Sequence, residues 1–125
     1  MTWTLTLPYT KPPISLNDRW QTPAGRRAHS AKVQQVRADV VTLARAANIP
    51  ALEAIHVTLH YRPRDNRRRD SDNLVGTLKP CVDAIVQAGV VPDDCAPYVD
   101  WSRPVIHPAI PGTAPSLWLV VEAVA

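Results

Sequence analysis

The sequence contains no phenylalanine, one methionine and only four glycines among its 125 residues. A hydrophobic core must therefore be built from valine, isoleucine and leucine, together with four tryptophans and three tyrosines. No apolar run is long enough to span a membrane, and the amino end lacks the pattern of a secretory signal peptide. We therefore expect a cytoplasmic protein that has no membrane partner.

Cysteine is also scarce, since Cys81 and Cys95 are the only two in the chain. Two cysteines are too few for a disulfide framework, and both thiols are expected to be free and reduced. The four histidines do not have the spacing of zinc ligands. These scarcities exclude a small disulfide-stabilised secreted protein and a zinc-finger module.

The hydrophobic residues make up 46% of the chain, which is too much for a disordered protein. The length is that of one domain, so we expect residues 1–125 to fold as a single unit. A core of this size is modest, and dimerisation would enlarge it.

The spacing of apolar residues alternates between the periods of strands and helices. Strands are predicted at residues 2–7, 55–62, 98–106 and 116–124. Helices are predicted from about Ser30 to Asn48 and from about Asn73 to Ala88, with a long loop at 9–27 and a polar loop at 63–70. With the last two strands in position to form a hairpin, this order predicts an α+β fold: a small mixed β-sheet of about four strands with two main helices packed on one face.

Basic residues are concentrated in one segment. Eleven of the fourteen lysines and arginines are arginine, and five of those lie in one run, Arg62, Arg64, Arg67, Arg68 and Arg69. Guanidinium groups match phosphate oxygens in a bidentate manner, which predicts contact with a nucleic-acid backbone. The alternative is a solvated loop whose charge Asp65 partly neutralises.

Two carboxylates follow the arginines directly, in the sequence Asp70-Ser71-Asp72-Asn73. If the segment is extended, the side chains of Asp70 and Asp72 point the same way and both reach one divalent cation. The alternative is a helix amino terminus, where Asp72 acts as the N-cap and Asp70 lies near the helix dipole. An EF-hand loop starting at Asp70 is excluded, because Val75 and Cys81 replace its glycine and glutamate.

A second acidic pair, Asp93-Asp94, follows the second predicted helix. A helix of about 15 residues is about 22 Å long, so Asp94 approaches Asp72 only if residues 90–92 run back along the helix. The alternative is a solvated acidic turn.

These motifs occur in the order of the RusA-type Holliday-junction resolvase family, which the chain resembles over nearly its whole length. The resemblance rests on the arginine run, on the D-x-D-N motif and on a lysine, a D-A-I motif and a G…D-D turn. Those residues are Arg67–Leu74, Lys79, Asp83–Ile85, Ala88–Gly89 and Asp93–Asp94, with Leu7–Pro8, Pro12–Pro13, Ser15, Asn17 and Arg19 near the amino end.

The resemblance implies a homodimer that binds branched DNA and nicks four-way junctions symmetrically in recombination and repair, in a bacterial or phage-infected cell. It implies Mg²⁺ as cofactor, with Mn²⁺ as a substitute, held by the essential acids Asp70, Asp72 and Asp94. It also implies a catalytic lysine, which matches Lys79. This lysine lies further from Asn73 than in the family pattern, and an ion pair with Asp83 is its alternative role.

Further basic residues extend the predicted DNA-binding surface, and Trp20 is a candidate for stacking on an unpaired base. The candidate DNA-binding residues are Arg64, Arg67, Arg68, Arg69, Lys11, Arg19, Arg26 and Arg27. Three alternatives remain open: a catalytically inactive basic DNA-binding module, a related nuclease acting on flaps or forks, and an unrelated α+β protein in which D-x-D-N is only a helix cap.

Overall fold

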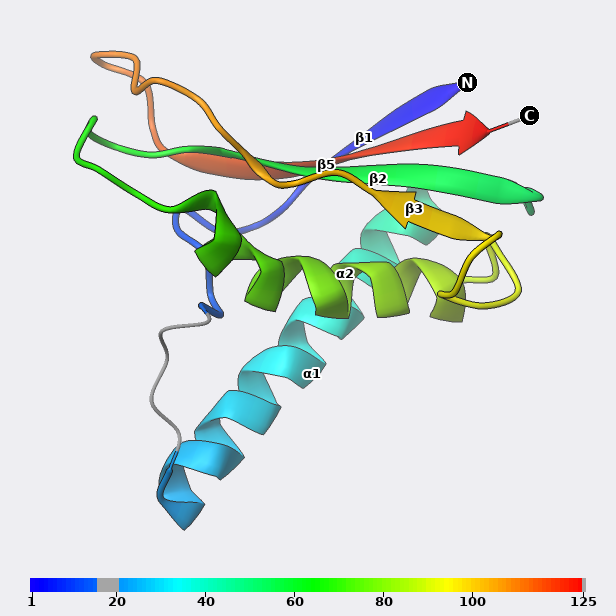
Figure 1. The fold of residues 1–125 in the computed structure, drawn as a ribbon, viewed down its shortest axis with the longest axis horizontal. Helices are drawn as coiled ribbons and strands as arrows, with labels where there is room; N and C mark the ends of the chain where they lie inside the picture. The colour runs from blue at the N-terminus through cyan, green and yellow to red at the C-terminus, as the bar shows by residue number, and fades with distance from the viewer. Residues whose placement is uncertain (16–20, 125) are drawn as a thin grey trace.

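The computed structural model describes residues 1–15 and 21–124. Its strands are β1 (Thr2–Thr6), β2 (Ala54–Arg62), β3 (Val99–Trp101), β4 (Val105–Ile106) and β5 (Ser116–Val124). Its helices are α1 (Pro23–Ala46), a single 3₁₀ turn η1 (Ser71–Leu74) and α2 (Val75–Gln87). The predicted α+β class is confirmed: a five-stranded mixed sheet lies on two helices (Figure 1).

The strands lie in the order β1-β5-β2-β3, and β4 pairs with β2 beyond the end of β3. β5 is antiparallel to both β1 and β2, whereas β3 and β4 are parallel to β2. The predicted strand at 98–106 is therefore two short strands, and the expected hairpin between the last two strands is wrong. Pro104 interrupts the ladder between β3 and β4, which suits an edge position.

β5 lies inside the sheet, where it pairs along its whole length with β2 and along its middle part with β1. It pairs with β2 from Ala54↔Val124 to Arg62↔Ser116, and with β1 from Thr2↔Glu122 to Thr6↔Trp118. Its inward residues Leu117, Leu119 and Val121 are completely buried. In this position β5 has a hydrogen-bonded neighbour on each side, β1 and β2.

Both helices cover the same face of the sheet, as predicted (Figure 1). The core between the layers is formed by alternate residues of β2 and by the apolar stripes of the two helices. Its fully buried members include Ile55, Val57, Leu59, Val40, Leu78, Cys81, Ala84 and Ile85. No helix in residues 1–15 and 21–124 is both long enough and apolar enough to cross a bilayer.

α1 begins seven residues before the predicted start at Ser30, so the predicted loop at 9–27 is too long. Thr22 is the N-cap, and its hydroxyl accepts a hydrogen bond of 3.0 Å from the amide of Gly25. Pro23 occupies the first turn, where its missing N–H costs nothing. A threonine followed by proline is typical of a helix start. The sequence analysis missed this signal because the neighbouring residues also favour loops.

α2 follows the D-x-D-N motif almost without a break, because η1 leads directly into it. Pro80 lies inside the helix, so it cannot donate a hydrogen bond to the carbonyl of Gly76. Gly89 follows the helix with φ of 87°, the left-handed conformation expected of a glycine that ends a helix. The predicted helical segment is thus confirmed to within two residues at each end.

Candidate active site

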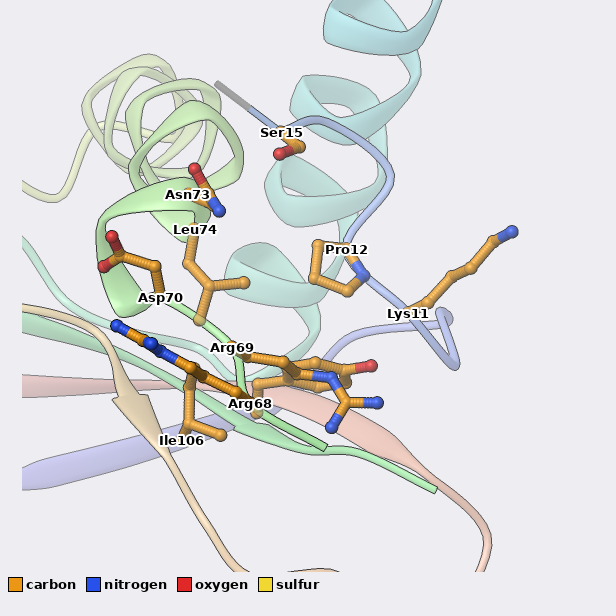
Figure 2. Close-up of a pocket in the computed structure, with 10 residues that line it drawn as sticks. Lys11, Pro12, Ser15, Arg68, Arg69, Asp70, Asn73, Leu74 and Ile106 are labelled. Atoms are coloured by element: carbon orange, nitrogen blue, oxygen red, sulfur yellow. The ribbon is translucent and has the colours of Figure 1, made fainter. Parts of the chain in front are cut away.

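The arginine run, the D-x-D-N motif and the amino-terminal loop meet at one pocket, which we call the basic pocket. β2 delivers the chain into the arginine loop (residues 63–69), and η1 then carries it into α2. The basic pocket has a volume of about 350 Å³ (Figure 2). Its lining residues are Lys11, Pro12, Ser15, Tyr61, Arg68, Arg69, Asp70, Asn73, Leu74 and Ile106.

Two hydrogen-bonded links hold the amino-terminal loop against the helices. The hydroxyl of Thr77 donates to the carbonyl of Ile14 at 2.5 Å and accepts from the amide of Ile14 at 3.3 Å. The hydroxyl of Tyr9 donates to a carboxylate oxygen of Asp39 on α1. Burial, followed by this hydrogen bond, raises the pKa of Tyr9 above its ordinary value. These links fix the wall of the pocket that carries Lys11.

Asp65 is the counter-ion of most of the arginine loop. Its carboxylate lies 3.5 Å from Arg64, 3.0 Å from Arg67 and 2.7 Å from Arg69. The hydrogen bond from Arg69 is the main reason that the pKa of Asp65 falls to about 2. The alternative interpretation of this run, a loop partly neutralised by Asp65, is therefore present in the structure. Arg68 instead lines the basic pocket.

Asp70 lies at the start of a helix rather than in an extended pair. It is the N-cap of η1, and its carboxylate accepts a hydrogen bond of 3.0 Å from the amide of Asp72. The expectation of an extended D-x-D segment is therefore wrong. The alternative, a helix amino terminus, is present, but Asp70 rather than Asp72 is the N-cap. The short side chains of aspartate compete for backbone N–H groups in this way wherever a helix begins.

Asp72 is paired with a residue that the sequence analysis did not single out. Arg103 lies between β3 and β4 and donates to one oxygen of Asp72 from Nε at 3.0 Å and from Nη2 at 2.8 Å. The hydrogen bond to Asp72 raises the pKa of Arg103 further. The contact joins positions 31 residues apart, so no local spacing in the sequence indicates it.

Lys79 lies between two carboxylates. Its Nζ is 3.0 Å from Asp83 and 2.6 Å from Asp94. The hydrogen bond to Asp94 is the main reason that the pKa of Lys79 is raised, and the same bond is the main reason that the pKa of Asp94 is lowered. The segment after α2 therefore does bring Asp94 back to the helix, at Lys79. The alternative Lys79–Asp83 ion pair is also present.

The three candidate metal ligands are spread along η1 and α2. Asp70 lines the basic pocket, whereas Asp94 and Lys79 line a smaller hollow of about 150 Å³ that shares no lining residue with it. Within the described ranges, no three or more histidine, cysteine or acidic side chains are grouped closely enough to hold a metal ion. The donor chemistry suits Mg²⁺, since all three side chains offer carboxylate oxygens, although each already accepts a hydrogen bond from the chain itself.

The remaining candidate DNA-binding residues lie in different places. Lys11 is on the rim of the basic pocket. Arg26 and Arg27 are exposed in the first turns of α1, whose amino end projects away from the sheet (Figure 1). Arg19 lies outside the described residues, as do Trp20 and Asn17.

The open face of the sheet carries a group of rings that the sequence analysis did not single out. Nδ1 of His60 lies 2.9 Å from Nε2 of His107, and both rings stack on Trp118. The guanidinium of Arg62 lies 5.3 Å from the centre of the Trp118 ring. Burial, then the proximity of His107, lowers the pKa of His60. Cross-strand pairing of His60 with Trp118 explains this cluster.

In comparisons with known proteins, no family model matches the chain, and none of the curated proteins matches it.

Proposed function

We propose that the protein is a Mg²⁺-dependent, structure-selective endodeoxyribonuclease that nicks four-way DNA junctions as a homodimer. The observation that carries this proposal is the composition of the basic pocket, which Asp70 lines together with Lys11, Arg68 and Arg69 (Figure 2). A carboxylate beside phosphate-binding cations suits a site that both holds a DNA backbone and cuts it.

The basic side chains would hold the DNA. Lys11 and Arg68 line the pocket, and neither takes part in the ion pairs of Asp65. Their cationic groups would bind the phosphates on either side of the bond to be cut, which positions the backbone without selecting a base sequence. The arginines paired with Asp65 would exchange that partner for phosphate where the DNA reaches them.

The acidic side chains would hold the cofactor. Asp70, Asp72 and Asp94 would bind Mg²⁺, or Mn²⁺ in its place. When bound, the ion would supply charge stabilisation and an activated water for phosphodiester hydrolysis. Arg103 binds one oxygen of Asp72 and Lys79 binds one oxygen of Asp94, so these cations would compete with the ion for the two carboxylates.

Lys79 would act as a fixed positive charge. Its raised pKa keeps it protonated at neutral pH, so it is unsuited to take a proton from water. A protonated lysine released from Asp94 would instead donate to the oxygens of the phosphate as charge builds up on them.

A second candidate function is a basic DNA-binding module without catalysis. The observation that favours it is that Asp72 and Asp94 are each already paired with a cationic side chain of the chain itself. In that case the carboxylates would serve as structural ion pairs, and only the pocket and the arginine loop would contact DNA.

A cleavage assay tests the first proposal against the second. Purified protein is mixed with a labelled four-way junction, a flap, a fork and a linear duplex, each with Mg²⁺, with Mn²⁺ and with EDTA. Paired nicks in the junction that require the metal support the proposal. Metal-dependent cuts confined to flaps or forks would assign a related nuclease, and binding without cuts would assign the binding module.

A further inference from the structure

The basic pocket has an apolar floor that phosphate binding does not require. Tyr61, Leu74 and Ile106 form this floor, with Pro12 on one side. Tyr61 and Leu74 are almost fully buried, and Ile106 is partly buried in β4. Apolar surface predominates in the lining, although the surrounding segment is the most basic of the chain.

A row of backbone phosphates needs only exposed cations, because both the phosphates and the water around them are polar. A hollow with an apolar floor and a cationic rim instead matches a group that is flat and apolar at one end and anionic at the other. A nucleotide has this form once its base has left the stack, because the faces of a paired base are covered by its neighbours. The volume of about 350 Å³ is within the usual range for small-ligand pockets.

We propose that the basic pocket receives one unpaired nucleotide next to the phosphate that is cut. The base would lie on Leu74 and Ile106, and its phosphate would bind Lys11 and Arg68. The amide of Asn73, on the same rim as Asp70, both donates and accepts, and would meet the edge of the base (Figure 2). This inference rests on the proposed function, and it names an unpaired nucleotide at a branch or bulge as the feature recognised.

Binding measured in EDTA tests this inference without any cleavage. Three DNA probes of equal length are compared: a fully paired duplex, a duplex with one unpaired nucleotide, and the same duplex with an abasic unpaired site. The abasic probe keeps the phosphates and the bend but lacks the base. We expect the unpaired nucleotide to bind about tenfold more tightly than the abasic site, as the loss of one stacked base typically gives. Equal affinity for these two probes overturns the proposal.

A pair of tryptophan variants locates the effect in the pocket. Ile106→Trp fills the floor, whereas Val105→Trp adds the same ring at the neighbouring position of β4, which is 38% exposed and does not line the pocket. We expect Ile106→Trp to abolish the preference for the unpaired nucleotide and Val105→Trp to keep it. Each variant is first checked for an intact thermal transition. If Ile106→Trp is unfolded, the abasic comparison on the unmodified protein decides alone.

The two proposals fail in different experiments. A preference for the unpaired base together with no metal-dependent cutting of any branched DNA would reject the nuclease and keep the nucleotide pocket. Metal-dependent cutting together with equal binding of the unpaired and abasic probes would keep the nuclease and reject the pocket.

Discussion

The arginine loop and the acidic residues at η1 and after α2 carry opposite charges, and their charges are neutralised by partners at different distances along the chain. Asp65 pairs with arginines that lie at most four residues away. Asp72 and Asp94 instead pair with Arg103 and Lys79, which are 31 and 15 residues away. The charge of the loop is therefore set by local sequence, whereas the state of the acids depends on the fold.

Because of this difference, substitutions in the two regions should have different effects. A change in the arginine loop alters how strongly the surface attracts a polyanion but leaves the acids as they are. A change at Arg103 or Lys79 alters the acids themselves. Four experiments test this separation, beginning with the largest expected effect.

Asp70→Asn and Asp72→Asn should each reduce junction cleavage more than about a hundredfold, because the charge stabilisation that the metal provides is worth several kcal/mol. Junction binding should persist, since removing a carboxylate also removes repulsion against DNA. Asparagine keeps the N-cap at position 70, so little stability should be lost. Initial cleavage rates on a labelled junction check this prediction.

The control for these variants is Asp100→Asn, on β3, whose carboxylate contacts His56 and lies outside both hollows. Asp100→Asn should cleave the junction at the same rate as the unmodified protein. Normal cutting by Asp70→Asn or Asp72→Asn would show that the active-site assignment is wrong.

Replacing Arg67 and Arg68 together with alanine should weaken binding to all junction sequences by a similar factor. The slope of log affinity against log salt should become shallower by about one for each phosphate that the protein no longer binds. Salt titrations of junction binding measure this slope. Arg45→Ala, in the last turn of α1, is the control and should leave the slope unchanged. Weakening confined to particular sequences would point to readout of bases instead.

Arg103→Ala should tighten binding of Mn²⁺ about fivefold, because it removes the cation that now competes for Asp72. Calorimetric titration of the protein without DNA measures this affinity. Arg103→Lys should restore weaker binding, since it returns a positive charge to the same position. An unchanged affinity in Arg103→Ala would mean that Asp72 does not bind the ion.

Asp65 should give a small acid-dependent contribution to stability. Its pKa is lowered from 3.8 to about 2 in the folded protein, so the stability it provides is present above pH 3.8 and is lost as the pH falls through about 2. Asp65→Asn should therefore lower the melting temperature by about 1 to 3 °C near pH 6, and this difference should become much smaller near pH 2. A difference of the same size near pH 2 would rule out this carboxylate as its source.

The sequence predicted those parts of the fold that local pattern controls. The last strand was predicted with its observed bounds because residues 117–121 form a continuous apolar run that follows a turn rich in proline and glycine, and α2 was located by its apolar stripe. The partners of the last strand could not be predicted, because a hairpin and a central position place the same residues inward. The start of α1 was missed because Thr22, Pro23 and Gly25 also occur in loops.

The same division applies to the candidate site. Local pattern located Asp70 and the arginine loop, whereas Lys79 was singled out only by the family resemblance. The i,i+4 spacing of Lys79 and Asp83 and the position of Asp65 in the arginine loop correctly indicated the alternative partners. It did not indicate the Arg103–Asp72 pair, which depends on how the β3–β4 edge lies against η1. Nor did it indicate the apolar floor, because Tyr61, Leu74 and Ile106 come from three separate elements and each has an ordinary place in its own pattern.

The paired hydrogen bonds between Thr77 and Ile14 have a consequence for how the protein opens. Thr77 is completely buried, and it is the only buried polar side chain among the described residues. The amide of Ile14 can therefore exchange with solvent only when the packed face of α2 separates from its neighbours. Hydrogen exchange should show Ile14 and the core of α2 opening as one cooperative unit. The wall that carries Lys11 is thus preformed, and under the proposed function a ligand that enters the basic pocket would lose little affinity to the ordering of a loop.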